Sequence, residues 1–125
     1  MRSDVGKVLL IDDHEDTRVL CRMVLEAEGY EVFEAASGDE GIAIALAERP
    51  ACVVMDVGLP DLDGYEVAMR IRAADPHHTI ALAALTGHGG EEARARGRRA
   101  GFDAHLVKPI DPSVIVATVA QLTRR

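Results

Sequence analysis

The chain has 125 residues, 48% of them hydrophobic and 28% charged, so it is long enough and apolar enough to form one globular domain with its own core. Only 3% of the residues are aromatic and none is Trp, so we expect a core of Val, Leu, Ile, Ala and Met. The formal net charge of −7 argues against a nucleic-acid-binding surface, because such a surface needs clustered positive charge.

Hydrophobic periodicity predicts five strands that alternate with five helices. The expected strands are apolar runs, which are typical of strands buried on both faces, and they cover residues 5–11, 31–35, 51–55, 79–85 and 102–107. Alternation at this spacing predicts parallel strands in a doubly wound α/β sheet. No repeat or linker interrupts the pattern, so we expect a single domain over residues 1–125 with no output domain in this chain.

Local signals mark the ends of the expected helices. Ser37 and Glu40 fit the capping box that opens a helix. Asp63 and Asp111 are expected N-caps of the third and fifth helices. The fourth helix is expected over residues 91–100. Three residues are expected to end helices: Gly29, Pro50 and Pro76.

The two cysteines and the absence of long apolar runs bear on location. Cys21 and Cys52 form no CxxC pair, and we interpret them as small buried residues in a reducing compartment. The chain shows no secretory signal and no apolar run of membrane-spanning length. We therefore expect a cytoplasmic protein without membrane contact.

Four of the five expected strands end in residues suited to phosphate chemistry. The first ends in Asp12 and Asp13, the third in Asp56, the fourth in Thr86 and the fifth in Lys108. An aspartate after a strand often only starts a turn, so Asp56 alone is weak evidence. Ligands bind beyond the carboxyl ends of strands in open parallel sheets, however, so we expect all five side chains on one rim.

These side chains together describe a phosphoryl-transfer site with a carboxylate nucleophile. Three carboxylates in one cleft repel one another unless a cation neutralises them, and carboxylate and carbonyl oxygens suit Mg²⁺. A lysine adds a compact positive charge, and a threonine hydroxyl can bind a phosphoryl oxygen. The chain has 12 Arg but only two Lys, Lys7 and Lys108, and a need for a point charge would explain a lysine at the rim.

Four short motifs lie at these strand ends: Asp12-Asp13, Asp56 followed by Leu59-Pro60-Asp61-Leu62-Asp63-Gly64, Thr86-Gly87, and Lys108-Pro109. With them the chain resembles, over essentially its whole length, the receiver domain of bacterial two-component response regulators. The resemblance implies a flavodoxin-like (βα)5 fold with strand order 2-1-3-4-5, and often a cis Lys-Pro bond. The stretch 101–112 is similar to receivers attached to hybrid histidine kinases.

The resemblance also implies roles for the rim residues. Asp56 would accept a phosphoryl group from a phosphohistidine on a histidine kinase or histidine phosphotransfer protein. Mg²⁺ would be held by Asp56, by Asp13 directly, by Asp12 through water and by the backbone carbonyl of Gly58. The phosphoryl group would be bound by Thr86 and Lys108.

The histidines depart from the family pattern. His105 stands where many receivers have Tyr or Phe as a rotating switch residue, and we interpret it as filling that place together with Thr86; a role in pH sensing is the alternative. His14 and His88 are expected near the site, where they could tune the lifetime of the phosphoryl group.

The fourth helix contains Gly97 and follows a Gly-rich loop, which predicts a loosely held element. Its positive charges suit either a solvated face or a docking patch for a partner: Arg94, Arg96, Arg98 and Arg99.

Two other functions compete with the phosphorylated switch. A phosphatase of the haloacid dehalogenase type needs a second Asp two residues after the nucleophile, and Gly58 disfavours it. A pseudo-receiver that only binds partners is disfavoured by the complete rim set. We expect a protein that catalyses only its own phosphorylation and dephosphorylation, acts on an unknown output partner, and is a monomer or a weak homodimer.

Overall fold

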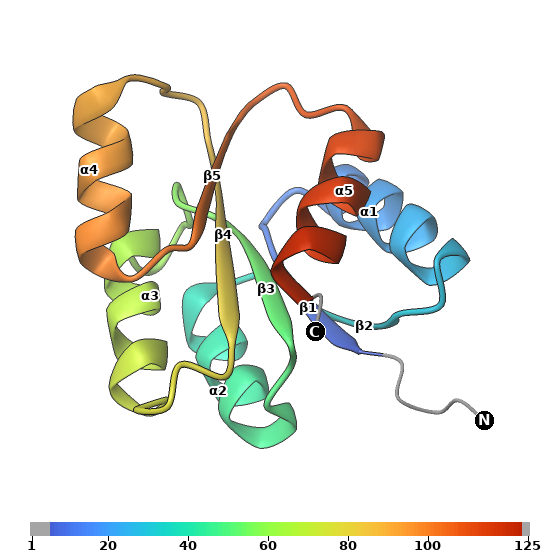
Figure 1. The fold of residues 1–125 in the computed structure, drawn as a ribbon, viewed down its shortest axis with the longest axis horizontal. Coiled ribbons are helices and arrows are strands. Elements are labelled where there is room, and N and C mark those ends of the chain that lie inside the picture. The colour runs from blue at the N-terminus through green and yellow to red at the C-terminus, as the bar shows by residue number, and fades with distance from the viewer. Residues whose placement is uncertain (1–5, 124–125) are drawn as a thin grey trace.

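The computed structural model describes residues 6–123, which form five strands and five helices in strict alternation (Figure 1). The strands are β1 (Lys7–Ile11), β2 (Glu31–Ala35), β3 (Cys52–Asp56), β4 (Ala81–Thr86) and β5 (Ala104–Val107). The helices are α1 (Glu15–Ala27), α2 (Gly38–Glu48), α3 (Gly64–Ala73), α4 (Glu91–Ala100) and α5 (Pro112–Thr123). Every expected element is present, and Val5 of the first expected strand lies outside the described residues.

The strands β4 and β5 begin two residues later than expected, because the residues before them use their backbone groups locally. The N–H groups of Thr79 and Ile80 donate to the side chain of Asp75, at 2.9 Å each. The N–H of Phe102 donates to the carbonyl of Gly97 at the end of α4. The sheet ladder therefore starts only at the residues that follow.

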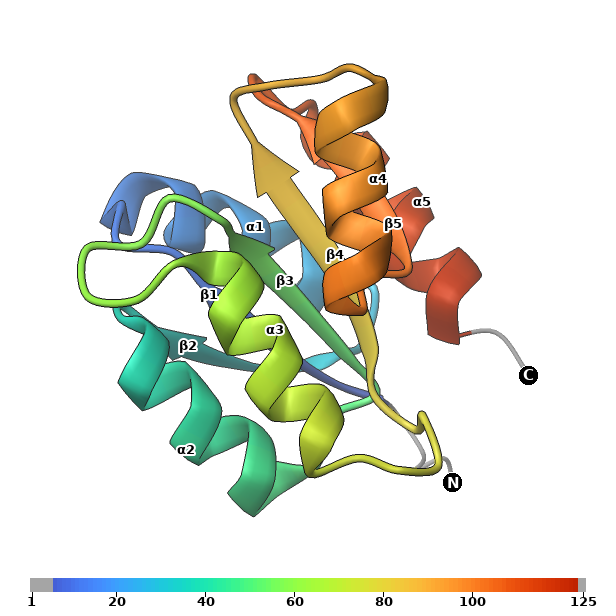
Figure 2. The same cartoon turned by 90° about the vertical axis from the view of Figure 1, so that its left-hand side faces the viewer.

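The five strands form one parallel sheet in the order β2-β1-β3-β4-β5, which confirms the predicted topology. All five residues of the central strand β3 are buried, which explains its unbroken apolar sequence up to Asp56. Because every strand runs the same way, the five carboxyl ends meet at one edge of the sheet (Figure 2).

Helices cover both faces of the sheet: α1 and α5 lie on one face, and α2, α3 and α4 on the other (Figure 1). Leu25 and Ile115 are buried in the first layer, and Ile71 in the second. Each such side chain contributes roughly 1.5–3 kcal/mol by leaving water. Cys21 and Cys52 are free and buried in the first layer, as predicted.

The helix ends follow the sequence signals with one difference. The Ser37 hydroxyl accepts from the N–H of Glu40 at 3.2 Å, but the Glu40 carboxylate accepts from Ala36 rather than from Ser37. Asp63 and Asp111 accept from the N–H groups two residues on, at 2.9 and 2.8 Å. Glycines in the left-handed region follow the ends of α1 and α4, at Gly29 (φ 98°) and Gly101 (φ 112°).

Helix α4 is the least anchored to the core. Its N-cap residue, Gly90, makes no side-chain cap, and only Gly97 and Ala100 of this helix are buried. These features support the prediction that α4 is loosely held. None of the described helices is long and apolar enough to cross a membrane.

Candidate functional site

The sheet brings the predicted rim residues to one edge. Asp12 and Asp13 follow β1 directly, Asp56 is the last residue of β3, Thr86 is the last of β4 and Lys108 follows β5. These four strands are neighbours in the sheet. Residues up to 96 positions apart in sequence therefore share one site, as the strand-end argument predicts.

Three of the rim side chains are buried, and Asp13 is exposed. Asp12 is 2% exposed, Asp56 6% and Thr86 2%. The Asp56 carboxylate accepts from the N–H of Gly58 and from Lys108 Nζ, both at 2.8 Å. A buried carboxylate is costly unless it is paired, so the lysine is the partner that keeps Asp56 ionised.

Asp12 is less completely paired than Asp56. Its Oδ1 accepts from the N–H of His14 at 2.9 Å. Its Oδ2 has no hydrogen-bond partner and lies 3.7 Å from Lys108 Nζ. A buried oxygen with an open position, at the edge where ligands bind, is suited to a further cation or to a donor on a ligand.

The charge of Lys108 is stabilised by these carboxylates. Burial opposes its positive charge, but the hydrogen bond to Asp56 and the negative charges of Asp12, Asp56 and Asp13 outweigh burial and hold its pKa above the ordinary lysine value. Lys108 is therefore a fixed positive charge at the rim, beside the carboxylate predicted to be phosphorylated.

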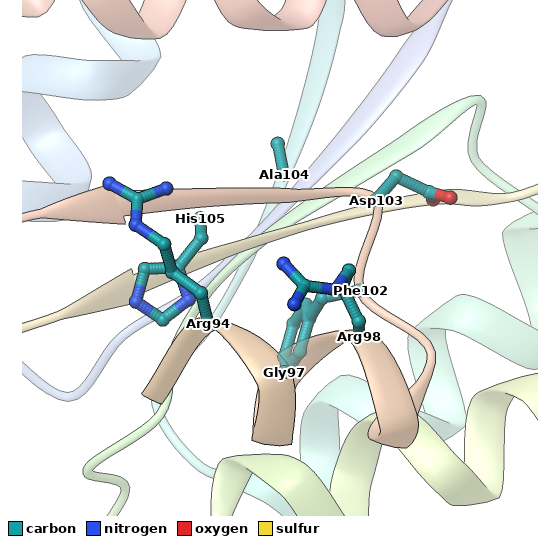
Figure 3. A pocket seen from close by; sticks show the side chains of 7 residues that line it. All are labelled: Arg94, Gly97, Arg98, Phe102, Asp103, Ala104 and His105. Carbon is teal, nitrogen blue, oxygen red and sulfur yellow. The ribbon is translucent and has the colours of Figure 1, made fainter. Parts of the chain in front are cut away.

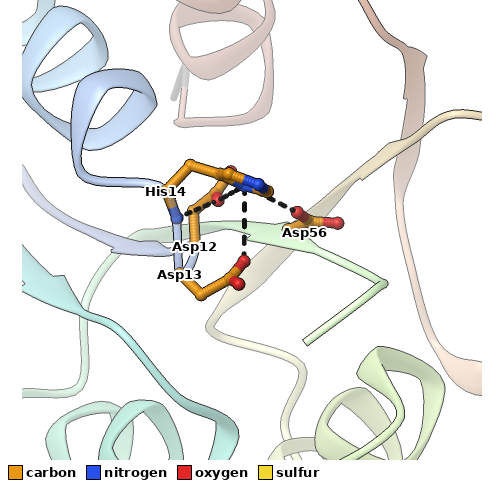
Figure 4. A group of neighbouring side chains, drawn as sticks. All are labelled: Asp12, Asp13, His14 and Asp56. Atoms are coloured by element: carbon orange, nitrogen blue, oxygen red, sulfur yellow. Dashed lines mark hydrogen bonds and ion pairs between the residues drawn. The ribbon is translucent and has the colours of Figure 1, made fainter. Parts of the chain in front are cut away.

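His14 lies among the rim carboxylates (Figure 4). Its Nδ1 is 3.0 Å from Asp12 Oδ1, 3.3 Å from Asp13 Oδ1 and 3.9 Å from Asp56 Oδ2. Sequence reasoning placed this histidine near the site but did not predict such direct contact. The only signal was its position next to the two aspartates.

The carboxylates fit the predicted metal. One ligand atom each from Asp12, Asp13, His14 and Asp56 lie within 4.8 Å of one another, close enough to share one ion. An oxygen-rich set with the open Asp12 Oδ2 suits Mg²⁺. The predicted role of the Gly58 carbonyl stays a prediction; the contact found for Gly58 is its N–H donating to Asp56.

His88 connects the two predicted switch residues. Its N–H donates to the Thr86 hydroxyl at 3.1 Å, and its carbonyl lies 3.4 Å from His105 Nε2. A group that drew the Thr86 hydroxyl toward the site would compete with the His88 bond. The loop between β4 and α4 is thus joined to both positions.

The His105 ring points from β5 toward α4, into a pocket beside Arg94 and Arg98 (Figure 3). Its Nδ1 is buried without a hydrogen-bond partner. A Cβ at Gly97 would lie 3.4 Å from this nitrogen, so the glycine leaves room for the ring. The interior glycine of α4 thus has a packing reason as well as a cost.

Asp61 has a structural role that sequence reasoning missed. It lies in the loop after β3, and its two carboxylate oxygens accept from the N–H groups of Gly38 and Asp39 at the start of α2, at 2.8 and 3.0 Å. These bonds lower the pKa of Asp61. Asp61 was identified only as part of a motif. The Lys108-Pro109 bond is cis, as the resemblance implied.

Comparisons with known proteins agree with this geometry. The family model of the response regulator receiver domain matches residues 8–120. The transcriptional regulatory protein SrrA of Staphylococcus aureus is 36% identical over 120 residues, which cover 96% of this chain and 48% of that protein. The chain thus spans about half the length of the curated relatives it matches.

Two solved structures share the fold. The chemotaxis response regulator CheY4 of Vibrio cholerae is 30% identical with a TM-score of 0.88, over 94% of this chain and 98% of that one. A putative response regulator from Chloroflexus aurantiacus is 32% identical with a TM-score of 0.89, over 98% of this chain and all of that one.

Proposed function

This chain belongs to the response regulator receiver domain family, and from that premise we propose that it is a phosphorylation-dependent signalling switch with Asp56 as the phosphoacceptor. One observation carries the proposal. Asp56 is a buried carboxylate at the end of the central strand, 2.8 Å from Lys108 and grouped with Asp12 and Asp13 within metal-ligand distance. That arrangement supplies a nucleophile and the positive charge that a transferred phosphoryl group needs.

The proposed donor is a phosphohistidine on a histidine kinase or a histidine phosphotransfer protein. An Asp56 oxygen forms a new P–O bond while the P–N bond of the donor breaks, and the electron pair returns to the donor imidazole, which takes up a proton. The Nζ of Lys108 lies at the accepting carboxylate and stabilises the negative charge brought by the phosphoryl group. Attack of water on phosphorus later restores the free carboxylate.

Mg²⁺ is the proposed cofactor, held by Asp12, Asp13, Asp56 and the carbonyl of Gly58. When bound, it supplies positive charge to the phosphoryl oxygens. The three carboxylates otherwise repel one another, so their grouping supports a site for a cation.

Thr86 and His105 are the proposed switch. The Thr86 hydroxyl, which accepts from His88 in this structure, would donate to the phosphoryl group, and the loop bearing His88 would move with it. The His105 ring, close to the His88 carbonyl, would follow. Phosphorylation shifts the two states only by its different stabilisation of each, so this rearrangement sets the size of the response.

Helix α1 supports docking of the donor close to the site. Leu20 and Met23 are large apolar residues that are 46% and 59% exposed on this helix. A groove that includes Leu20 runs between α1 and α5 and reaches Lys108. We place the protein in the cytoplasm, where such donors act, and propose that phosphorylation changes its binding to an output partner.

Acetyl phosphate with MgCl₂ tests the proposal. We expect the intact mass of the wild type to rise by one phosphoryl group, and the mass of Asp56→Asn to stay unchanged. Beryllofluoride should shift the amide NMR signals around Thr86 in the wild type only. An unchanged mass and spectrum would favour a pseudo-receiver, and a modification that survives Asp56→Asn would show that another residue is the acceptor.

The protein is proposed to turn over no external phosphate ester. p-Nitrophenyl phosphate should therefore be hydrolysed no faster by the wild type than by Asp56→Asn. Sustained hydrolysis that depends on Asp56 would instead identify a phosphatase.

A further inference from the structure

His14 offers the metal site a nitrogen ligand that the proposed oxygen set does not include. It is the last residue before α1, and its N–H bond to Asp12 Oδ1 fixes the turn that carries it. The ring turns inward, so that Nδ1 lies between the carboxylates of the β1 and β3 ends (Figure 4). The side chain is nevertheless 64% exposed, so core packing does not account for its position.

The distances around Nδ1 suit shared coordination of one ion. An octahedral ion with bonds of about 2.1 Å sets neighbouring ligand atoms about 3.0 Å apart and opposite ones about 4.2 Å apart. Nδ1 lies 3.0 Å from Asp12 Oδ1, 3.3 Å from Asp13 Oδ1 and 3.9 Å from Asp56 Oδ2, within that range. The ring therefore already stands where a ligand of the same ion would stand.

A second observation points to a bound cation. Asp12 is 2% exposed, yet its Oδ2 has no hydrogen-bond partner. The nearest positive charge, Lys108 Nζ, is 3.7 Å away and donates to Asp56 instead. A buried carboxylate oxygen left open in this way is suited to a metal on the side where His14 lies.

Nitrogen changes which metal such a site prefers. Carboxylate and carbonyl oxygens suit Mg²⁺, whereas imidazole suits Zn²⁺, Ni²⁺ and other first-row transition metals. We propose that His14 Nδ1 is a direct metal ligand, and that this receiver binds first-row transition-metal ions such as Zn²⁺ more tightly through it, while His14 adds little to the binding of Mg²⁺. The inference rests on the metal site of the proposed function and adds its selectivity.

Isothermal titration of the metal-free protein with ZnCl₂ and with MgCl₂ tests the inference. His14→Ala should weaken Zn²⁺ binding by about tenfold or more and change Mg²⁺ binding by less than about threefold. His77→Ala is the matched control, because His77 is an exposed histidine at the opposite end of the sheet, and it should change neither affinity. Equal effects of His14→Ala on both metals, or tighter binding of both, would overturn the inference.

The ring nitrogens give a direct readout. In long-range ¹H–¹⁵N spectra of the wild type, ZnCl₂ should shift the Nδ1 signal of His14 more than its Nε2 signal, and MgCl₂ should shift neither strongly. A Zn²⁺ shift confined to other histidines would contradict direct ligation. Because these measurements need no phosphoryl donor, they separate the two proposals: phosphorylation with Mg²⁺ can succeed while His14 ligation fails, and the reverse.

Discussion

Buried aspartates lie at both ends of the sheet, and their surroundings differ. At the amino end, Asp75 is 2% exposed, and its two oxygens accept from the Thr79 N–H and hydroxyl and from the Ile80 N–H. Arg72 completes this pairing at 3.2 Å. At the carboxyl end, Asp12 is equally buried, but one of its oxygens has no hydrogen bond.

The difference separates a structural carboxylate from one arranged for a ligand. The Arg72 guanidinium also reaches the carbonyls of Gly101 and Ile80 and the carboxylate of Asp103, so it joins α3, β4 and the loop before β5. The rim instead gathers carboxylates from two strand ends around one lysine. We therefore expect changes at the amino end to reduce stability and changes at the rim to reduce the response to ligands.

The largest expected effect is that of Asp75→Ala. It removes the acceptor of three hydrogen bonds and leaves Arg72 without its buried partner, so we expect a loss of about 3–5 kcal/mol in the free energy of unfolding. Urea denaturation followed by circular dichroism measures it. The control Asp111→Ala removes an exposed N-cap and should cost much less. Similar losses in both variants would contradict the comparison.

This same contrast shows what sequence can and cannot predict. The rim was predictable because strand ends are local features, and parallel pairing then places Asp56 and Lys108 together. The Asp75 network was not predictable, because it depends on Arg72 reaching the loop before β5, 31 residues away at Asp103. His14 is intermediate: its place in the chain was evident, but the direction of its ring depends on the turn after β1.

Metal binding is expected to give the next largest effect, and only through the rim. MgCl₂ at about 100 times its dissociation constant should stabilise the wild type by about 2.7 kcal/mol, because the ion binds the folded state. Asp13→Asn should lose most of this gain, since it removes a proposed ligand that is exposed and adds little to the core. Thermal unfolding with and without MgCl₂ measures both. A full Mg²⁺ response in Asp13→Asn would contradict its role.

The pH dependence of stability sharpens the role of Asp75. Burial alone would raise its pKa, but the hydrogen bonds from Thr79 and Ile80 and the charge of Arg72 lower it to about 2. A lowered pKa stabilises the folded state above the unfolded value of about 4, and this contribution is lost as the pH falls toward 2.

The matched variant for this effect is Asp75→Asn, which keeps the side chain's shape but cannot ionise. The wild type should lose roughly 1–2 kcal/mol more than Asp75→Asn between pH 5 and pH 2. Urea unfolding at several pH values measures the difference. Parallel pH profiles for the two proteins would show that Asp75 does not titrate with folding.

The smallest effect is expected from His105→Tyr, on the switch side of the rim. His105 contacts the His88 carbonyl and packs beside Gly97, but it touches none of the carboxylates around Asp56 in any contact found here. The larger ring also removes a buried nitrogen that has no hydrogen bond, so we expect stability to change by less than about 1 kcal/mol. The rate of phosphorylation by acetyl phosphate should stay within about twofold, since the phosphoacceptor and its lysine are untouched. A large loss of phosphorylation in His105→Tyr would place this histidine in the chemistry of the site rather than in switching alone.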